Sequence, residues 1–343
     1  MPERTTVTLA DVAARAGVSL ATASRALNGS TRRVRAESVE RVHAAARELR
    51  YTANVQAQAV ARGTTTTLGL VVGDIADPYF AAIAAGAMRA ADEAGLVVTI
   101  LSTGGDPSRE AGVLGVVAGL RPRAVVLAVS RHTGVPGDEV QGAIAALVAG
   151  GAGVSALVSD LDGVGVPGVD GLVIRNTSGA AALAGALVEQ GHDSFAVLAG
   201  EPSLVTAHAR VEGFLAGLAA HGVRVPDAAV VPSEFSRDGG HRAMVSLLDR
   251  PPGGILPRCV FAVTDLMAVG AIAAIRERGL VPGVDVGVAG FDDVGMLADV
   301  VPALSTVRLP LEEIGARGVR RALGSDDGGA VDGEVVLRAS TAR

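Results

Sequence analysis

Tryptophan and lysine are absent from the 343-residue chain, and cysteine occurs once, at Cys259. A single cysteine excludes an intramolecular disulfide framework and is typical of a protein in a reducing cytosol. Because the apolar run Val260 to Val263 follows it, we expect the thiol to lie in a buried strand. Aromatic residues make up only 2% of the chain, whereas alanine, glycine and valine are abundant. This composition favours a valine-rich parallel sheet packed against helices of small residues.

Long apolar runs and signature motifs of enzymes are also missing. No uncharged run reaches the roughly 18 apolar residues of a membrane span, and the polar N-terminus has no signal-peptide pattern. We therefore expect a soluble, cytoplasmic protein with no membrane partner. The sequence has no Walker loop, paired cysteines, His-x-x-x-His spacing or Gly-x-Ser-x-Gly elbow. We expect no catalytic residue, no metal site and no cofactor.

The basic residues are concentrated near the N-terminus. Residues 1–62 hold ten Arg against five acidic residues, whereas the remainder holds twenty Arg against thirty-one acidic residues. A basic segment on an acidic body directs phosphate attraction to that segment. The charge distribution alone is also compatible with a chance run of solvated arginines. Whether the segment binds nucleic acid therefore has to be judged from its pattern of residue types.

The basic segment carries the pattern of a helix-turn-helix. Thr8 followed by Asp11 is a capping-box-like start for a helix that ends at Gly17. A second helix is predicted from Leu20 to Leu27 and a third from about Ala36 to Arg50. Two helices of about eight residues joined by a tight turn with a glycine are typical of this DNA-binding motif. By periodicity alone, any small three-helix domain remains possible.

Beyond the polar linker at residues 63–67, strands and helices alternate, which implies parallel sheets with right-handed crossovers. The length suits two doubly wound lobes, so the predicted fold class is α/β, with a small all-α head before two parallel-sheet lobes. The expected strands are 68–72, 97–101, 124–129, 154–158, 195–199, 260–263 and 286–289. The expected helices are 79–94, 109–120, 177–190, 211–221 and 267–278, with a helix-like stretch at 142–149.

A dehydrogenase is the main alternative among enzymes. Residues 151–156 fit the dinucleotide fingerprint Gly-x-Gly-x-x-Ala, and Asp170 follows at a loosely suitable distance. That fingerprint should follow a strand and open a helix. Here it follows the helix-like stretch and runs into the expected strand 154–158, so the context disfavours nucleotide binding.

Three runs of residues resemble the head of the LacI/GalR family of bacterial transcription regulators: 8–13 (TLADVA), 16–19 (AGVS) and 22–29 (TASRALNG). Residues 47–54 resemble the end of that family's third helix and the start of its hinge, and the similarity continues to residues 338–341. The resemblance implies a sequence-specific regulator, most simply a repressor, that binds operator DNA as a homodimer, with a tetramer not excluded. It also implies a periplasmic-binding-protein-like core with a small-molecule effector, sugar-like or related, between the lobes.

The resemblance also implies which residues bind DNA. Leu20, Ala21 and Arg25 match base-reading positions, and Arg25 is suited to guanine. Residues 54–62 match a hinge helix that enters the minor groove, with Val60 in place of the usual leucine wedge. Arg35 replaces a helix-capping serine. The implied DNA-binding set is Thr8, Ser19, Leu20, Ala21, Thr22, Ser24, Arg25, Asn28, Asn54, Ala57 and Val60.

For the effector, polar residues after strands are the candidates, since ligands of open α/β sheets sit at the carboxyl ends of strands. By resemblance, the implied effector-binding set is Asp74, Tyr79, Phe80, Arg175, Arg210, Thr264, Asp265 and Asp292. An arginine donor, carboxylate acceptors and an aromatic wall suit a polyol or sugar. Arg175 stands where the family usually has aspartate, which suggests a phosphorylated or carboxylated ligand. Each residue alone could be a surface charge or a helix cap; Asp265, for example, could cap the helix at 267–278.

The resulting domain assignment has four parts. Residues 1–53 form the head and 54–67 the hinge helix and linker. The N-terminal lobe is 68–174 plus 307–324, and the C-terminal lobe is 175–306 plus 325–343, with strands crossing between lobes near Arg175, Phe291 and 305–308. A binding protein without gene control would explain the core alone, but the basic head and the missing signal peptide disfavour it.

Overall fold

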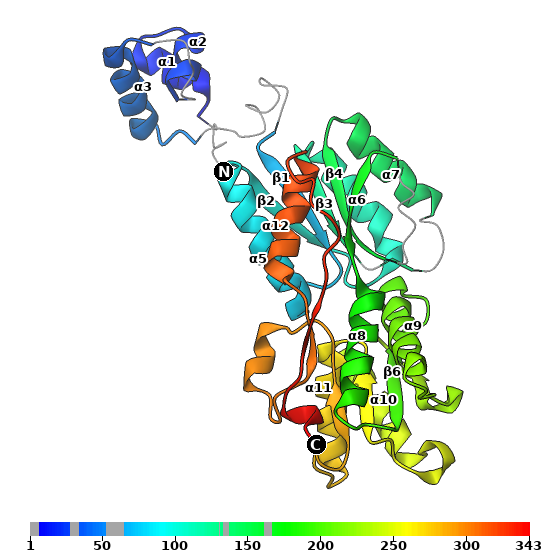
Figure 1. The fold of residues 1–343 in the computed structure, drawn as a ribbon. Coiled ribbons are helices and arrows are strands. Elements are labelled where there is room, and N and C mark those ends of the chain that lie inside the picture. Colours follow the sequence, from blue (N-terminus) through cyan, green and yellow to red (C-terminus); the bar gives the residue numbers. More distant parts are fainter. Residues whose placement is uncertain (1–6, 28–33, 53–64, 130, 133–136, 161–166) are drawn as a thin grey trace, which may run out of the picture. The chain divides into compact units, whose positions relative to one another are not determined.

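The computed structural model describes residues 7–27, 34–52, 65–129, 131–132, 137–160 and 167–343. Contacts divide the chain after Thr65 into two units, here called the head and the core, which we describe separately. The mixed fold class predicted from the sequence is confirmed: the head is helical and the core contains parallel sheets (Figure 1).

The head consists of α1 (Leu9–Ala16), α2 (Leu20–Leu27) and α3 (Ala36–Glu48). The predicted capping box is formed, because Thr8 Oγ1 accepts from the Asp11 amide at 3.4 Å and Asp11 Oδ2 accepts from the Thr8 amide at 2.8 Å. Gly17 ends α1 at a φ of 65°, a left-handed conformation that glycine adopts without strain. Small apolar residues from all three helices form the buried centre, among them Val12, Ala13, Ala23, Val42 and Ala45.

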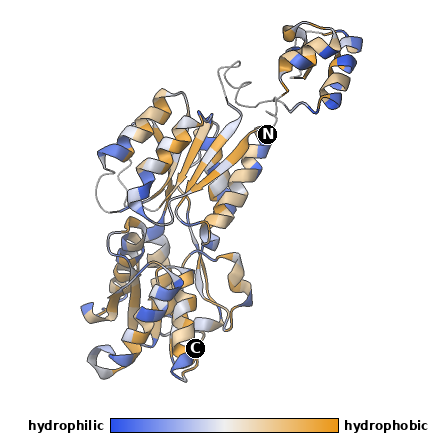
Figure 2. Ribbon diagram, turned by 180° about the vertical axis from the view of Figure 1, so that it is seen from behind, coloured by the Kyte–Doolittle hydropathy of each residue, from blue (hydrophilic) through white to orange (hydrophobic). Residues whose placement is uncertain are grey.

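The N-terminal lobe of the core is a five-stranded sheet of order β2-β1-β3-β4-β5, with all paired strands parallel. Its strands are β1 (Thr67–Val72), β2 (Val97–Ser102), β3 (Ala124–Ala128), β4 (Gly153–Ser159) and β5 (Val169–Ile174). Its helices are α5 (Pro78–Glu93), α6 (Glu110–Gly119), α7 (Asp138–Ala149) and α12 (Leu311–Ala322). Figure 2 shows the strands as hydrophobic, as expected for a sheet covered on both faces.

The C-terminal lobe repeats this plan with a four-stranded parallel sheet of order β7-β6-β8-β9. Its strands are β6 (Phe195–Gly200), β7 (Val230–Pro232), β8 (Cys259–Ala262) and β9 (Gly287–Ala289). Its helices are α8 (Asn176–Glu189), α9 (Val205–Ala220), α10 (Arg237–Asp249) and α11 (Asp265–Glu277). As predicted, Cys259 lies buried in a strand, and burial raises the pKa of its thiol to about 12. Phe214 stacks on Phe261 at 4.3 Å between ring centroids in the same core.

Three segments join the lobes, and one of them differs from the prediction. The chain crosses from β5 into α8 at Arg175, and from β10 (Thr306–Arg308) into α12. It returns through Val331, whose amide donates to Val173 O at 2.8 Å, before β11 (Glu334–Val336) pairs antiparallel with β10.

The crossing predicted near Phe291 is wrong, because Phe291 stays in the C-terminal lobe. Its carbonyl accepts from the Asp265 amide at 2.9 Å, and the neighbouring Gly290 amide donates to Ser305 O at 2.9 Å. The predicted start of the helix at 211 is also wrong, since α9 already begins at Val205. Among the described residues, no helix is long and apolar enough to cross a membrane.

Candidate functional site

The exposed start of α2 is the candidate DNA-reading surface of the head. Ser19 Oγ accepts from the Thr22 amide at 3.2 Å, so the helix is capped where the sequence predicts. Leu20 is 52% exposed and Ala21 is exposed beside it. Arg25 lies half-buried one turn further on, and its Nε donates to Ala21 O at 3.0 Å. Two apolar side chains and one arginine therefore share the first two turns of this helix.

The other predicted DNA-binding residues either have structural contacts in the head or lie outside the described residues. Thr8 serves as the cap of α1, and Ser24 lies half-buried on α2. Arg35 stands at the N-cap of α3 and forms no side-chain cap hydrogen bond. Four predicted residues lie outside the described residues: Asn28, Asn54, Ala57 and Val60.

The centre of the core site is a buried arginine on α9. Arg210 is 2% exposed, and its Nη2 meets Asp292 Oδ1 at 2.7 Å. Its Nε donates to Asn176 Oδ1 at 2.9 Å and its Nη1 to Val263 O at 2.8 Å. The guanidinium also lies 4.0 Å from the ring centroid of Phe291. The start of α8 and the segments after β8 and β9 are thus tied to one side chain of α9.

The backbone of Asp292 has an unusual conformation, which positions its side chain beside Arg210. Its φ is 118°, a region that side chains rarely occupy, and its amide donates to Val307 O in β10 at 2.8 Å. Burial raises the pKa of Asp292 to about 7, although Arg210 acts in the opposite direction. Nearby Asp77 adds to the rise because it is a second carboxylate. The site therefore contains more potential negative charge than positive charge.

Thr264 and Asp265 have mainly structural contacts. Thr264, rather than Asp265, caps α11 by accepting from the Met267 amide at 3.2 Å. Asp265 is buried and accepts from Thr306 Oγ1 at 2.7 Å and from the Val294 amide at 3.0 Å. Burial raises the pKa of Asp265, and the charge of Asp292 adds to the effect. Asp265 thereby fastens the segment after β9 and the crossing strand β10 to α11.

The N-terminal lobe contributes an aromatic wall from the start of α5. Tyr79 and Phe80 meet edge to face, with 5.1 Å between ring centroids. Asp77 caps the helix by accepting from the Tyr79 amide at 2.9 Å, and burial raises the pKa of Asp77. Asp74 is exposed and accepts from the Ala76 amide at 3.0 Å, which places it at the rim.

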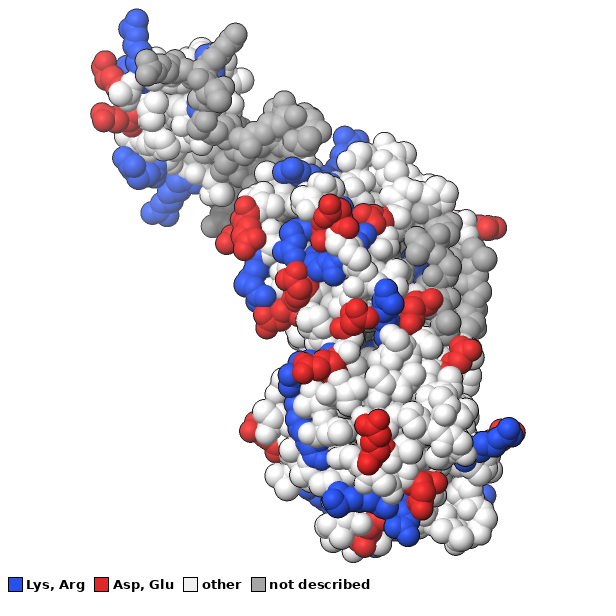
Figure 3. Space-filling model, in the orientation of Figure 1, with Lys and Arg blue, Asp and Glu red and all other residues white. Residues whose placement is uncertain are grey.

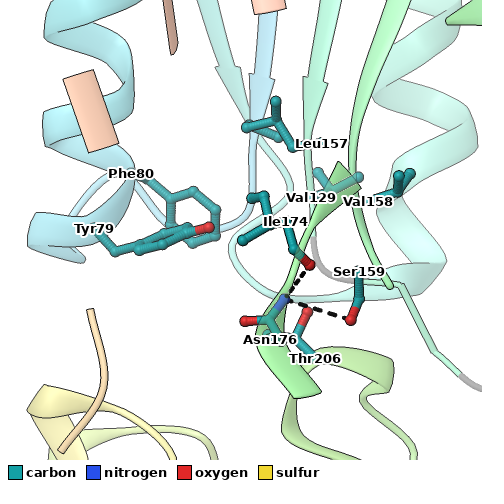
Figure 4. A pocket seen from close by; sticks show the side chains of 10 residues that line it. Tyr79, Phe80, Val129, Leu157, Val158, Ser159, Ile174, Asn176 and Thr206 are labelled. Atoms are coloured by element: carbon teal, nitrogen blue, oxygen red, sulfur yellow. Dashed lines mark hydrogen bonds between the residues drawn. The ribbon is translucent and has the colours of Figure 1, made fainter. Parts of the chain in front are cut away.

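A small pocket lies between the aromatic wall and the C-terminal lobe (Figure 4). Its cavity measures about 30 Å³, the order of one water molecule. The sequence predicted Tyr79 and Phe80 in this lining but missed Asn176, Ser159 and Thr206. Asn176 Nδ2 donates to Ser159 Oγ at 3.4 Å and to Ile174 O at 3.3 Å. Its position two residues after the end of β5 is the signal that could have revealed it.

Arg175 does not line this pocket, although it precedes Asn176. It lines a separate groove beside the β5–α8 crossing and pairs with Asp332 at 3.4 Å. Its charge therefore belongs to a different surface from the one predicted. Figure 3 shows red and blue side chains mixed over the α5–α12 face of the core, where Arg89 pairs with Glu312.

The two lobes also make a direct contact with each other near the start of α9. His132, which follows β3, lies with its Nδ1 2.9 Å from Ser203 Oγ of the C-terminal lobe. Ser203 Oγ donates to Glu201 Oε1 at 2.8 Å, and the Val205 amide donates to Arg131 O at 2.9 Å. We call this set of contacts the clasp. It adjoins Thr206, so the clasp and the pocket share the start of α9.

Comparisons with known proteins match both units. Residues 8–54 match the model of bacterial regulatory proteins of the lacI family, and residues 184–342 match that of a periplasmic binding protein-like domain. The HTH-type transcriptional regulator GalR of Escherichia coli (strain K12) is 31% identical over 328 residues, which cover 93% of this chain and 89% of GalR.

Solved structures agree over nearly the whole chain. The lac repressor dimer bound to operator and the anti-inducer ONPF matches with a TM-score of 0.81 and 27% identity, covering 98% of this chain and 99% of the other. A complex of the transcriptional regulator CelR with cellobiose matches with a TM-score of 0.67 and 29% identity, covering 97% of this chain and 99% of the other. The match therefore includes the head and both lobes together.

Proposed function

The chain belongs to the lacI family of bacterial regulatory proteins, and on that premise we propose that it represses transcription by binding operator DNA under the control of a small molecule. The observation that carries the proposal is that head and core match regulators as one continuous chain, with 93% of it aligned to GalR. An enzyme is not indicated, since the relatives are transcription regulators. A DNA-binding regulator of this kind works in the bacterial cytoplasm.

We assign DNA reading to the first turns of α2. Its exposed Leu20 and Ala21 and the longer Arg25 suit base edges in a major groove. Thr22, Ser24 and Asn28 would contact phosphates, and Asn54, Ala57 and Val60 would enter the minor groove. The domain boundaries proposed with this assignment remain 1–53, 54–67, 68–174 with 307–324, and 175–306 with 325–343.

The effector proposed for the pocket is a neutral, hydroxyl-rich molecule such as a sugar. Arg210 already faces Asp292, and Asp77 adds a second carboxylate, so an anionic ligand would meet repulsion. Asp77, Arg210 and Asp292 do not line the pocket, but Asn176, Ser159 and Thr206 do, and their polar groups suit hydroxyls. Tyr79 and Phe80 would cover the apolar face of a ring. The complex of CelR with cellobiose supports this class of ligand.

The proposed mechanism couples the pocket to DNA through the lobe angle. A cavity of about 30 Å³ is too small for a sugar, so binding requires the lobes to move apart around it. In a homodimer, as in the lac repressor complex with operator, such a movement changes the spacing of two heads on two half-sites. Effector affinity and operator affinity are then linked by one coupling free energy.

Selection of genomic fragments by the purified protein, at stated salt, tests the proposal. We expect enrichment of a partly symmetric motif, retained by Arg41→Ala and lost by Arg25→Ala. Arg41 is the matched control, since it lies on α3 of the same head. A panel of neutral sugars should then release the enriched fragment from wild type but not from Asp292→Ala. Equal retention by wild type and Arg25→Ala would contradict the assignment of α2.

A further inference from the structure

A groove beside the β5–α8 crossing shares Ser159 with the cleft pocket, and its other lining residues differ from those of the pocket. It measures about 410 Å³, within the usual range of small-molecule sites. The N-terminal lobe contributes Asp160 and Val173 to its lining, the C-terminal lobe Thr177 and Ala216, and the returning segment Ala330. A ligand in the groove would therefore contact both lobes and the crossing segments at once.

Arg175 is a cation in the lining of the groove, and its ion pair with Asp332 is long and exposed. Its Nε is 3.4 Å from Asp332 Oδ1, and the two side chains are 54% and 75% exposed. An ion pair so exposed is weak, because water screens both charges. The planar guanidinium can instead bind a carboxylate through two parallel hydrogen bonds.

The opposite side of the groove limits the charge that a ligand can carry. Asp160 accepts from the Thr177 amide with both carboxylate oxygens, at 3.2 and 3.1 Å, and so occupies the start of α8. A second negative charge near that helix end would be repelled by Asp160. Thr177 Oγ1 is buried and, among the described residues, has no hydrogen-bond partner, so the Thr177 hydroxyl adds no competing ligand for Arg175.

Part of the lining of the groove is formed by small apolar side chains. These are Ala181 on α8, Ala216 on α9, Val173 and Ala330. Such a lining suits a short hydrocarbon or aryl body rather than a second polar group.

We propose that this groove binds a small monocarboxylate, with its carboxylate on Arg175 and its apolar body against Ala181 and Ala216. Binding of the ligand should change the angle between the two lobes. The reason is that the Arg175 amide donates to Val331 O at 2.9 Å, where two crossing segments meet. The ligand thus forms a second regulatory input, separate from the cleft pocket. The regulatory part, but not the binding, rests on the proposed function.

Titration calorimetry of the full-length protein without DNA tests the binding, with hexanoate and benzoate as probes. We expect both to bind wild type, and at least tenfold more weakly to Arg175→Gln and to Ala216→Leu, which fills an exposed part of the groove. Arg258→Gln is the matched control, since Arg258 pairs with Asp193 at 3.5 Å with 60% and 73% exposure. It should bind like wild type.

Comparison ligands fix the chemical class. Hexanol lacks the charge and inorganic phosphate lacks the apolar body, so each should bind at least tenfold more weakly than hexanoate. Equal binding of either one, no binding of both carboxylates, or unchanged binding in Arg175→Gln and Ala216→Leu would overturn the proposal.

A second readout separates this proposal from the proposed function. Hexanoate should shift retention of the selected operator by wild type and not by Arg175→Gln. Failure of every variant to select DNA would refute the regulator while leaving carboxylate binding measurable. DNA selection with no hexanoate effect would refute the second input alone.

Discussion

Arg210 and Asp292 form an ion pair in the interior of the C-terminal lobe, with 2.7 Å between Nη2 and Oδ1 and only 2% and 5% of the side chains exposed. They are 82 residues apart in the chain. Removing two charges from water costs free energy that their attraction only partly returns. Well-packed apolar residues could therefore hold these elements at least as firmly, so the pair is weak evidence of added stability. What the pair does is tie α9 to the segment after β9.

Breaking the pair from either side should destabilise the core strongly. Arg210→Met and Asp292→Asn each leave a buried polar or charged partner, at an expected cost of about 3–5 kcal/mol. The double variant should lose less than the sum of the two, by about 0.5–3 kcal/mol. Urea unfolding at pH 8, where Asp292 is ionised because its pKa is about 7, measures this. The exposed pair Arg258–Asp193 is the control and should show coupling below about 1 kcal/mol. Additivity at the buried pair would contradict the prediction.

Asp293 should make the core sensitive to acid. Burial pushes the pKa of Asp293 up, but hydrogen bonds from Arg338 at 2.7 Å and Arg308 at 2.7 Å outweigh it, so the pKa is lowered overall. A carboxyl whose folded pKa is depressed stabilises the fold above its unfolded pKa, near 3.8, and this contribution is lost as pH falls through the folded value. Asp293→Asn should be less stable than wild type at pH 7, and the gap should narrow steadily below pH 3.8. Asparagine tolerates the φ of 56° at this position. A gap independent of pH would refute the assignment.

Two glycines on helices should respond oppositely to alanine. A Cβ at Gly213 on α9 would lie 2.1 Å from Thr177 O of α8, whereas one at Gly115 on α6 meets nothing within 4 Å. Gly213→Ala should therefore destabilise the core by about 1–3 kcal/mol through overpacking. Gly115→Ala should stabilise it by about 0.5–1 kcal/mol, because alanine loses less backbone entropy in a helix. Unfolding midpoints that move in the same direction would contradict this explanation of the α8–α9 contact.

The head and most sheet strands were predictable because their signals are local. Thr8 and Asp11 are three residues apart, and Gly17 ends α1 where the sequence indicates. The strand β1 differs from its predicted range by one residue, since a buried parallel strand is a continuous apolar run.

Segments with functional or close-packing residues were harder to predict. The helix α9 begins six residues before its predicted start because Thr206 and Arg210 interrupt the apolar pattern to face the pocket and the ion pair. The helix α10 is absent from the elements expected from the sequence, and its adjacent Gly239 and Gly240 lower its intrinsic helix propensity. A Cβ at Gly240 would lie 2.2 Å from Met267 O, so that glycine allows α10 to approach α11.

Of the predicted effector-binding residues, Tyr79 and Phe80 line the pocket, and the pairings of the others were not predicted. Arg210 and Asp292 were both proposed as ligand contacts, yet nothing in the sequence states that they face each other. Arg175 was assigned to the cleft on the family pattern, whereas its neighbour Asn176 lines the pocket. Successive residues at a strand-to-helix junction point in different directions, so a shift of one position changes which surface receives the charge.

The clasp between His132 and Ser203 should control how readily the lobes separate. Ser203→Ala removes the hydroxyl that lies 2.9 Å from His132 Nδ1 and also donates to Glu201. The main-chain bond from Val205 to Arg131 would then be the remaining part of the clasp in the described residues, and its amide should exchange faster with solvent. Hydrogen exchange followed by mass spectrometry should show faster exchange in peptides that cover residues 203–206, and in those around position 131 across the cleft.

Ser236→Ala is the matched control for that measurement. Ser236 caps α10 in the same lobe by accepting from the Gly239 amide at 3.0 Å, and no contact of it reaches the other lobe among the described residues. Its loss should speed exchange only at the start of α10. If Ser203→Ala behaves likewise, with faster exchange confined to its own lobe, the hydroxyl is a local cap and the lobes are held by the crossing segments. If exchange rises on both sides of the cleft, the clasp opens as one unit, and effector release should be faster in the same variant because the pocket adjoins it at Thr206.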